Sequence, residues 1–474
     1  MLNSPVGGRR RNFTRDTDRI RAWLAPLLVA VISAGALHLL ERSFRLTHGA
    51  GLPEGYRLQD WSSNWLMQTL GLEEMIPFGP RALVFNHIYP PLLDAIRLLM
   101  AHALPRIGDT ATYIEIDFGL YELSAICFGL VNAIVFLWVR DLTKSAWWAI
   151  GATAVWSLMP GYIMLMTLLD PSGLAMLFIT ASLFFLYLFL RRRNLCWATA
   201  FFAAMLLASL SRSVTQIHSL AVLVTSVVIF WIISSRRNWI WLFANIVLVS
   251  LMFVVPVKQY VLFATTDTTS FAGYHRVGML WIDPRTVPEI EYPKHMVDNA
   301  LAFSSRFNTQ ENIKDNYRLS AAANDFIVSH PFEAGTRLVR SLTITVPEMI
   351  RPSSMYTQNY LVEVLPWRGL WDWMFSSWRY GLMVLGAALI LIRVQGWRWV
   401  GAKVRRYGWF IAFYALFAAP ILLSNRYRPG EEDLGPVWTD AIRQKIFLEV
   451  PVIVGMTYAL WLLVKSLRGR YARG

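Results

Sequence analysis

An acidic residue follows the first long apolar run of the chain, within the sequence YRLQDW. A carboxylate beside a membrane surface can act as a general base and take the proton from an acceptor hydroxyl. Asp60 is our candidate for this role, with Glu73 and Glu74 farther along as reserves. Because Asp is also a favoured helix N-cap and precedes Trp61 here, a structural role stays open.

Cations near the same membrane surface could stabilise the negative charge that develops on a leaving phosphate. The candidates for phosphate binding are Arg212, Lys258, Arg276, Arg443 and Lys445. Two structural explanations compete: Arg212 could pair with Asp170, and Arg443 and Lys445 could snorkel at the end of a span. Asp170 itself is a possible second site acid or the cap of a helix that begins at Pro171.

The chain lacks several well-known site motifs. It has no HExxH, no clustered histidines, no phosphate-binding loop and no dinucleotide-binding glycine pattern. Cys127 and Cys196 are far apart and offer no disulfide framework or metal-site spacing. We therefore expect no cofactor, leave metal dependence open, and do not expect ATP or a sugar nucleotide as the direct donor.

The composition indicates what must position these residues. Of 474 residues, 55% are hydrophobic and only 16% are charged, whereas a soluble domain is about 25% charged. The sequence predicts an all-α polytopic membrane protein with about ten spans of roughly 20 apolar residues each. We place them at 23–41, 119–139, 146–168, 172–190, 196–211, 217–235, 239–257, 379–394, 408–424 and 446–464.

The net charge of +14 is distributed unevenly along the chain. Alternate connections between the apolar runs contain 22 of the basic residues and three acids, whereas all other parts contain 23 basic and 28 acidic residues. This asymmetry is the positive-inside pattern, so we expect both termini in the cytoplasm and no nucleic-acid partner. A basic, Trp-rich chain with few lysines and short connections is typical of bacteria, so we expect the bacterial inner membrane. The first apolar run is longer than a signal-peptide core of about 7–15 residues and predicts an uncleaved span.

The segments on the opposite side are long. We divide the chain into a basic N-terminus (1–22), a transmembrane core (23–257) that includes a loop at 42–118, an external helical segment (258–378) and C-terminal spans with a basic tail (379–474). The first loop contains an apolar stretch, Tyr89 to Leu104, whose charges suit an interfacial helix better than a span. Helical patterns in the external segment lie at 295–304, 315–329 and 331–344. Long loops of this kind are usually functional.

Four motifs follow one another in an order that resembles a known family. They are Asp60 followed by NHIYPPL at 86–92, LDP at 169–171, LASLSR at 207–212, and RQKIFLEVP at 443–451. In this order they resemble the GT-C glycosyltransferases, membrane enzymes of the mannosyl-, aminoarabinose- and arabinofuranosyl-transferase type. The sequence departs from that pattern where Ser213 and Val214 replace an expected proline and where Asp60 has no adjacent acid. The segment 265–378, which usually sets the acceptor, matches no motif we can name.

The resemblance implies an inverting transfer of a sugar from a polyprenyl-phosphate donor to a glycan, lipid or protein acceptor on the periplasmic face. It also implies Asp60 as base, and substrate contacts from His87, Tyr89 and Trp61. A related alternative is an O-antigen ligase or polymerase with a lipid-diphosphate donor, which would use the arginines of the external segment: Arg276, Arg285, Arg306, Arg318, Arg337, Arg340 and Arg351. A lipid or solute transporter is less favoured, because no internal repeat is found.

Overall fold

The computed structural model is helical throughout the residues it describes, with no strand among them. These residues are 9–48, 63, 69–103, 111–213, 226, 229, 239–263, 265, 267–291, 308–350, 365–374, 377–423 and 445–471. The first part of the chain forms α1 (Arg9–His48), α2 (Leu72–Phe78), α3 (Pro80–Phe85), α4 (Leu92–Ala103), α5 (Ala111–Thr143), α6 (Ala146–Ser157), α7 (Pro160–Thr167), α8 (Ser172–Arg192) and α9 (Leu195–Ser211). The second part forms α11 (Trp239–Met252), α12 (Val254–Phe263), α13 (Ala272–Met279), the short 3-10 helix η4 (Pro284–Thr286), α15 (Gln310–Ser329), α16 (Pro331–Ile350), α18 (Arg368–Met374), α19 (Ser377–Gln395), α20 (Trp397–Leu423) and α22 (Ile446–Tyr471).

The apolar helices are those of a multi-pass membrane protein. Within the described part of the chain, five stretches are long and apolar enough to cross a bilayer: Leu24–Ser43, Tyr113–Thr143, Ser172–Arg192, Trp239–Phe263 and Ile446–Arg468. Two bent helix pairs raise the number of candidates to seven. The predicted span at 196–211 corresponds to the shorter helix α9, and the one at 217–235 lies almost wholly outside the described residues. The fold class is confirmed, while the count of ten spans stays a prediction.

One predicted span is a broken helix, and the spans predicted separately at 379–394 and 408–424 lie in the two helices of a second bent pair. The span predicted at 146–168 is α6 followed by α7, which meet at an angle of 65°. Pro160 begins α7 and has no N–H to continue the hydrogen bonds of α6, and the indole of Trp367 donates to the Leu158 carbonyl at the break (2.9 Å). Gly396 joins α19 to α20 with a φ of 79°, a conformation that favours glycine, and the two helices differ in direction by 112°.

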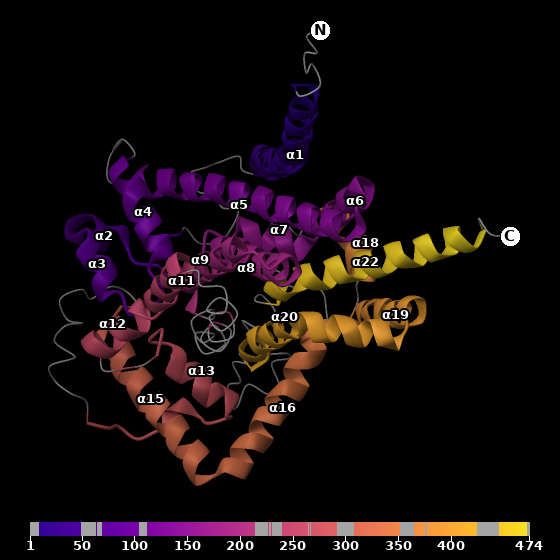
Figure 1. The fold of residues 1–474 in the computed structure, drawn as a ribbon. Helices are drawn as coiled ribbons and strands as arrows, with labels where there is room; N and C mark the ends of the chain where they lie inside the picture. Colours follow the sequence, from indigo (N-terminus) through magenta and orange to yellow (C-terminus); the bar gives the residue numbers. More distant parts are fainter. Residues whose placement is uncertain are drawn as a thin grey trace, which may run out of the picture.

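Helix α8 separates two chemically different ends of the bundle. At about 1.5 Å per residue, its 21 residues span roughly 31 Å, close to the thickness of a bilayer core. Asp170 and Ser172 lie at its N-terminal end, and Arg191 and Arg192 lie at its C-terminal end. We call these the acidic end and the basic end. In Figure 1, α2, α3, α4 and α12 lie on the left of the bundle, toward the acidic end, whereas α6 and the C-terminus lie on the right.

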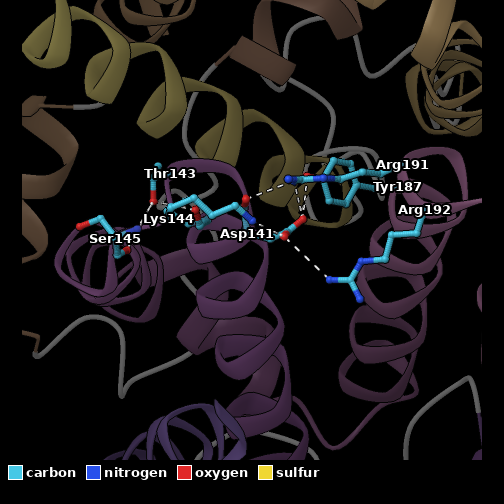
Figure 2. A network of polar contacts seen from close by, with 8 residues as sticks. Asp141, Thr143, Lys144, Ser145, Tyr187, Arg191 and Arg192 are labelled. Atoms are coloured by element: carbon cyan, nitrogen blue, oxygen red, sulfur yellow. Dashed lines mark hydrogen bonds and ion pairs between the residues drawn. The ribbon is translucent and has the colours of Figure 1, made fainter. Parts of the chain in front are cut away.

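A cluster of charges fastens three helices together at the basic end (Figure 2). Asp141, near the end of α5, accepts from Arg191 of α8 (2.5 Å) and from the Tyr187 hydroxyl (3.0 Å), and pairs with Lys144 (3.0 Å). Arg406 of α20 donates to the Arg191 carbonyl (3.0 Å). The basic connections that the sequence separates by up to 215 positions therefore meet at one end of the bundle, as the charge pattern predicts.

Helix α1 packs antiparallel to α5. His38 lies 3.0 Å from Glu122, and farther along α1 the Ala30 carbonyl lies against Gly129. A Cβ atom at position 129 would be 2.3 Å from this carbonyl oxygen, so only glycine allows the two backbones to approach this closely. The antiparallel contact directs the arginine-rich start of α1 toward the basic end.

Helices α13, α15 and α16 form a small hydrophobic core of their own around Val277, Leu280, Leu319, Ala323 and Ala334. The helical patterns predicted at 315–329 and 331–344 are confirmed as α15 and α16. The pattern predicted at 295–304 lies outside the described residues. Phe263 and Ile313 form a second contact, which joins α12 to α15. The helical segment is thus attached where α12 ends.

Replacing Gly129 with alanine should destabilise the protein by about 1–3 kcal/mol, because the added methyl group overpacks the α1–α5 contact. The midpoint of thermal unfolding in detergent measures this effect. Gly35→Ala is the matched control, since a Cβ at that position of α1 meets no atom within 4 Å. Equal midpoints for the two variants would show that the close backbone approach contributes nothing to stability.

Replacing Asp141 with asparagine leaves Arg191, Arg192 and Lys144 without their shared carboxylate. Because the Asp141 side chain is only 14% exposed, we expect a loss of about 1–3 kcal/mol, measured by thermal unfolding. Asp283→Asn, which breaks the exposed pair with Arg285, should cause a smaller change. A larger effect at position 283 would contradict the structural role of Asp141.

Candidate functional site

The segment that enters α4 is held by partners from distant parts of the chain. The His87 N–H donates to Asn308 Oδ1 (3.0 Å), and the His87 carbonyl accepts from the Ser270 N–H (2.9 Å) and from Gln259 Nε2 (3.2 Å). The Ile88 carbonyl accepts from the Thr269 hydroxyl. The first five residues of the motif NHIYPPL are therefore buried, and the backbone of His87 and Ile88 is held by residues near the end of α12 and the start of α15.

A buried network of charged and polar groups holds α4 in place. Arg97 donates to Asp94 (2.9 Å) and to the Leu70 carbonyl (2.7 Å), and Asn86 Nδ2 donates to Asp94 (3.0 Å). The sequence places these charges on an interfacial helix, and the structure buries both of them: Asp94 is 1% exposed and Arg97 is fully buried. The helix prediction is confirmed as α4, but its charges neutralise each other inside the protein and do not face water.

Lys258 of α12 contacts the anchored segment that contains Asn86 and His87. Its ammonium donates to the Asn86 carbonyl, and within the described residues it has no carboxylate partner. His87 lies beside it, with Nδ1 2.9 Å from the Ser270 hydroxyl and with the ring edge-on to Phe263. A positive charge held by neutral groups is suited to attract an anion.

Two buried polar atoms at this place have no hydrogen-bond partner among the described residues: Nε2 of His87 and Oε1 of Gln259. Buried polar atoms are normally satisfied, so these two mark a place where a bound molecule could supply the missing hydrogen bonds. Burial, with the nearby charge of Lys258 as a second cause, lowers the pKa of His87 to about 3. The imidazole is therefore neutral and can donate or accept at Nε2.

Three other predicted phosphate-binding cations, Arg212, Arg276 and Lys445, have carboxylate partners. Arg212, at the end of α9, pairs with Asp170 (3.5 Å), and both side chains are 3% exposed. Asp170 also accepts from the Ser172 N–H (2.7 Å) and hydroxyl (2.9 Å) and so holds the turn that leads into α8, whose N-cap position is Pro171. The expected alternative, that Arg212 pairs with Asp170, is confirmed. The pair links the α7–α8 turn to α9. The Arg212 guanidinium also lies 5.9 Å from the Phe447 ring of α22.

Arg276 and Lys445 are paired in the same way. Arg276 contacts Asp267, which also accepts from Asn316 (3.1 Å) and Ser320 (2.8 Å). Lys445 pairs with Glu449 of α22 (3.2 Å), and each of these two side chains is 3% exposed. These cations stabilise carboxylates of the protein, and the geometry favours Lys258 above them as an anion-binding residue.

One buried acid at the acidic end is not among the site residues that the sequence predicts. Asp117 of α5 is fully buried and accepts from the Ser63 N–H (3.1 and 3.3 Å). Two turns farther along α5, the Ser124 hydroxyl lies 3.5 Å from the position that a Cβ of Gly173 would occupy at the start of α8. Asp117 therefore fastens the first loop near the Asp170 turn. The sequence does contain a signal for this residue. Asp117 directly precedes the span predicted at 119–139, where burying a charge costs free energy.

Several predicted site residues are placed elsewhere or lie outside the described part. Asp60, Trp61 and Arg443 are outside it. Glu73 and Glu74 lie in the first turn of α2, where carboxylates favour the helix N-terminus, and Glu73 is exposed. Tyr89 is 5% exposed and its ring lies 6.3 Å from that of Phe271. The structure thus brings His87, Tyr89 and Lys258 together, and places Asp170, Arg212 and Lys445 at the same end of the bundle.

No group of three or more His, Cys, Asp or Glu residues among the described ones has the arrangement of a metal site. Comparison of the chain with known protein families, curated proteins and solved structures finds no match. The assignment of the site therefore rests on the sequence and on the geometry above.

The low pKa of His87 predicts a specific pH dependence of stability. Because His87 is neutral in the folded protein and protonates near pH 6.5 when unfolded, its contribution is fully present above pH 6.5 and is lost as the pH falls toward 3. Between pH 7.5 and 5.5 the wild type should lose about 1.4 kcal/mol that His87→Gln does not lose. Thermal unfolding at the two pH values measures this difference.

The control for this experiment is His102→Gln, which removes an exposed histidine at the end of the same region. It should keep the pH dependence of the wild type. If His87→Gln and the wild type lose stability in parallel as the pH falls, the imidazole is not held neutral in the folded state.

Proposed function

We propose that this chain is an integral membrane glycosyltransferase that transfers a sugar from a polyprenyl-phosphate donor to an acceptor hydroxyl. The observation that carries the proposal is the position of Lys258. Among the described residues its charge has only neutral partners, and it lies beside two unsatisfied buried polar atoms and against the anchored segment that contains His87. A donor phosphate offers a negative charge to Lys258 and an acceptor to Nε2 of His87, and a sugar hydroxyl can donate to Oε1 of Gln259.

The distribution of the motifs supports the same function. The segments at 86–92, 169–171, 207–212 and 445–451 are separated by long stretches of chain, and their helices meet at the acidic end of the bundle. This end lies about 31 Å from the basic end along α8. A lipid-linked donor has this polarity too, because its phosphate lies at the membrane surface while its chain stays in the bilayer.

The proposed reaction needs a base and an anion-stabilising group. The acceptor hydroxyl oxygen attacks the anomeric carbon, the bond from this carbon to the phosphate oxygen breaks, and the configuration inverts. The hydroxyl proton passes to a carboxylate, for which Asp60 stays our prediction, and polyprenyl phosphate leaves with the electron pair. Lys258 stabilises its charge, and the neutral His87 can donate from Nε2 to a phosphate oxygen. The phosphate leaves as an anion and requires no acid.

The ligase alternative depends on the arginines of the external segment, and most of those described are neutralised. Arg285 pairs with Asp283, Arg318 with Glu289 and Asp315, and Arg337 with Glu333. Arg340 instead lies 4.0 Å above the Trp281 ring. These contacts give little support to a second cationic clamp for a diphosphate, and we favour the monophosphate donor.

The test is glycosyl transfer by the purified protein in detergent, with radiolabelled polyprenyl-phosphate sugars and a crude extract of lipid and glycan acceptors. We expect Asp60→Asn to abolish transfer. Lys258→Gln should lower kcat/KM for the donor by about 10-fold or more, the worth of a charge-assisted hydrogen bond, and Lys258→Arg should restore part of it. Each variant must unfold at a temperature near that of the wild type.

Matched controls are Asp283→Asn, which removes the partner of the exposed Arg285, and Lys314→Gln at an exposed position of α15; both variants should keep full activity. Transfer that survives Asp60→Asn would move the base to Glu73, Glu74 or Asp117. Labelling only from a diphosphate-linked glycan would favour the ligase, and transfer from neither donor by well-folded protein would overturn the proposal in favour of a transporter.

A further inference from the structure

A cavity of about 680 Å³ lies between α6, α19 and α22, among the helices drawn on the right of Figure 1. Its walls are Trp, Val, Met, Ile, Leu, Ala and Gly side chains. Apart from two indoles, the only hydrogen-bonding side chain among the described residues that line it is Thr457, whose hydroxyl already donates to the Ile453 carbonyl (2.8 Å). A cavity without free polar groups selects an apolar occupant.

The cavity opens away from the protein core. Trp147 is 82% exposed, Leu460 47% and Met383 41%. All three walls belong to helices that are long and apolar enough to cross a membrane, singly or as a bent pair. The exposed side therefore faces the bilayer, and its volume lies within the range of about 300–1,000 Å³ that is usual for small-molecule sites. A hydrocarbon chain can enter from the bilayer and fill it.

Each of the three helices that line the cavity has a cationic residue just beyond the lining residues, toward the basic end of the bundle. Lys144 precedes Trp147 and Trp148 at the start of α6, Arg393 follows Ile390 by one turn of α19, and Lys465 follows Leu460 on α22. Arg393 and Lys465 are exposed. The Lys144 side chain is 66% exposed although it pairs with Asp141, a carboxylate that it shares with Arg191 and Arg192. The rim of the cavity, formed at this end by Lys144, Arg393 and Lys465, is therefore positively charged.

We propose that this cavity binds one chain of an anionic phospholipid, with the lipid phosphate held by Lys144, Arg393 and Lys465. Basic pockets between transmembrane helices are suited to anionic headgroups, and the apolar cavity directly beyond the cations accommodates the attached chain. A polyprenyl-phosphate donor bound at the candidate site would place its phosphate near Lys258, at the opposite end of the bundle. The charge at this rim thus fits a membrane lipid and not that donor, and the inference does not depend on the proposed function.

Native mass spectrometry of delipidated protein in detergent tests the proposal directly. Given equal amounts of phosphatidylglycerol and phosphatidylcholine with the same chains, the wild type should retain one phosphatidylglycerol with at least about 10-fold preference. Arg393→Gln and Lys465→Gln should each weaken this binding about fivefold, because one cation near a headgroup contributes about that factor. Added salt should weaken it as well.

A second variant tests the cavity itself. A Cβ at Gly386 meets no atom within 4 Å, so Gly386→Leu should fill the cavity without moving the helices and should abolish retention of the lipid. Gly401→Leu on α20 is the matched control, since this position is equally open but does not line the cavity. It should bind phosphatidylglycerol like the wild type.

Three results would overturn the proposal: equal retention of both phospholipids, undiminished retention by a folded Gly386→Leu variant, or displacement of phosphatidylglycerol by a lower concentration of polyprenyl phosphate. The last result would assign the cavity to the carrier lipid. Because no sugar donor or acceptor is present, failure of this experiment is independent of failure of the transfer assay.

Discussion

Neutralising buried charge is the constraint on which this structure depends. A charged group inside a membrane protein costs several kcal/mol unless another group compensates it. The described part of the chain solves this problem repeatedly, with Asp94–Arg97, Asp170–Arg212 and Lys445–Glu449 all buried as pairs. Each pair also fixes an element: Asp94–Arg97 orients α4, and Asp170–Arg212 joins the start of α8 to the end of α9. Several charged residues that the sequence suggests for catalysis or phosphate binding are therefore the ones whose ion pairs stabilise the acidic end.

This explains why Lys258 is distinct from the other cations at that end. Where a cation already has a buried carboxylate, an incoming phosphate must compete with a partner that is fixed and desolvated. Lys258 contacts a carbonyl dipole instead, so its charge is available to a ligand at lower cost. The neutral His87 beside it does not repel this charge, and its pKa of about 3 reflects the same burial and the same neighbour.

The two ends of the bundle serve different purposes. The basic end combines a structural cluster around Asp141 with exposed cations that follow an apolar cavity. The acidic end combines paired charges with unsatisfied buried atoms on His87 and Gln259. A cluster whose polar atoms are all paired stabilises the fold, whereas unpaired atoms and exposed charges leave capacity for binding. This distinction can be drawn only from contacts, because arginine, lysine and aspartate occur at both ends.

The sequence by itself determined the helical membrane class, the positions of five apolar spans and the gathering of basic residues at one end. These follow from hydrophobic length and charge order, which are local properties. It also indicated α4, α15 and α16, whose patterns are regular. It did not determine that Asp170 would pair with Arg212, 42 positions away, or that Asn308 and Gln259 would hold the His87 segment across more than 170 positions. Nor did it reveal Asp117 or the cavity beside Gly386. Those features depend on which helices become neighbours, and only the tertiary structure decides this, because many pairings satisfy the same pattern of apolar runs.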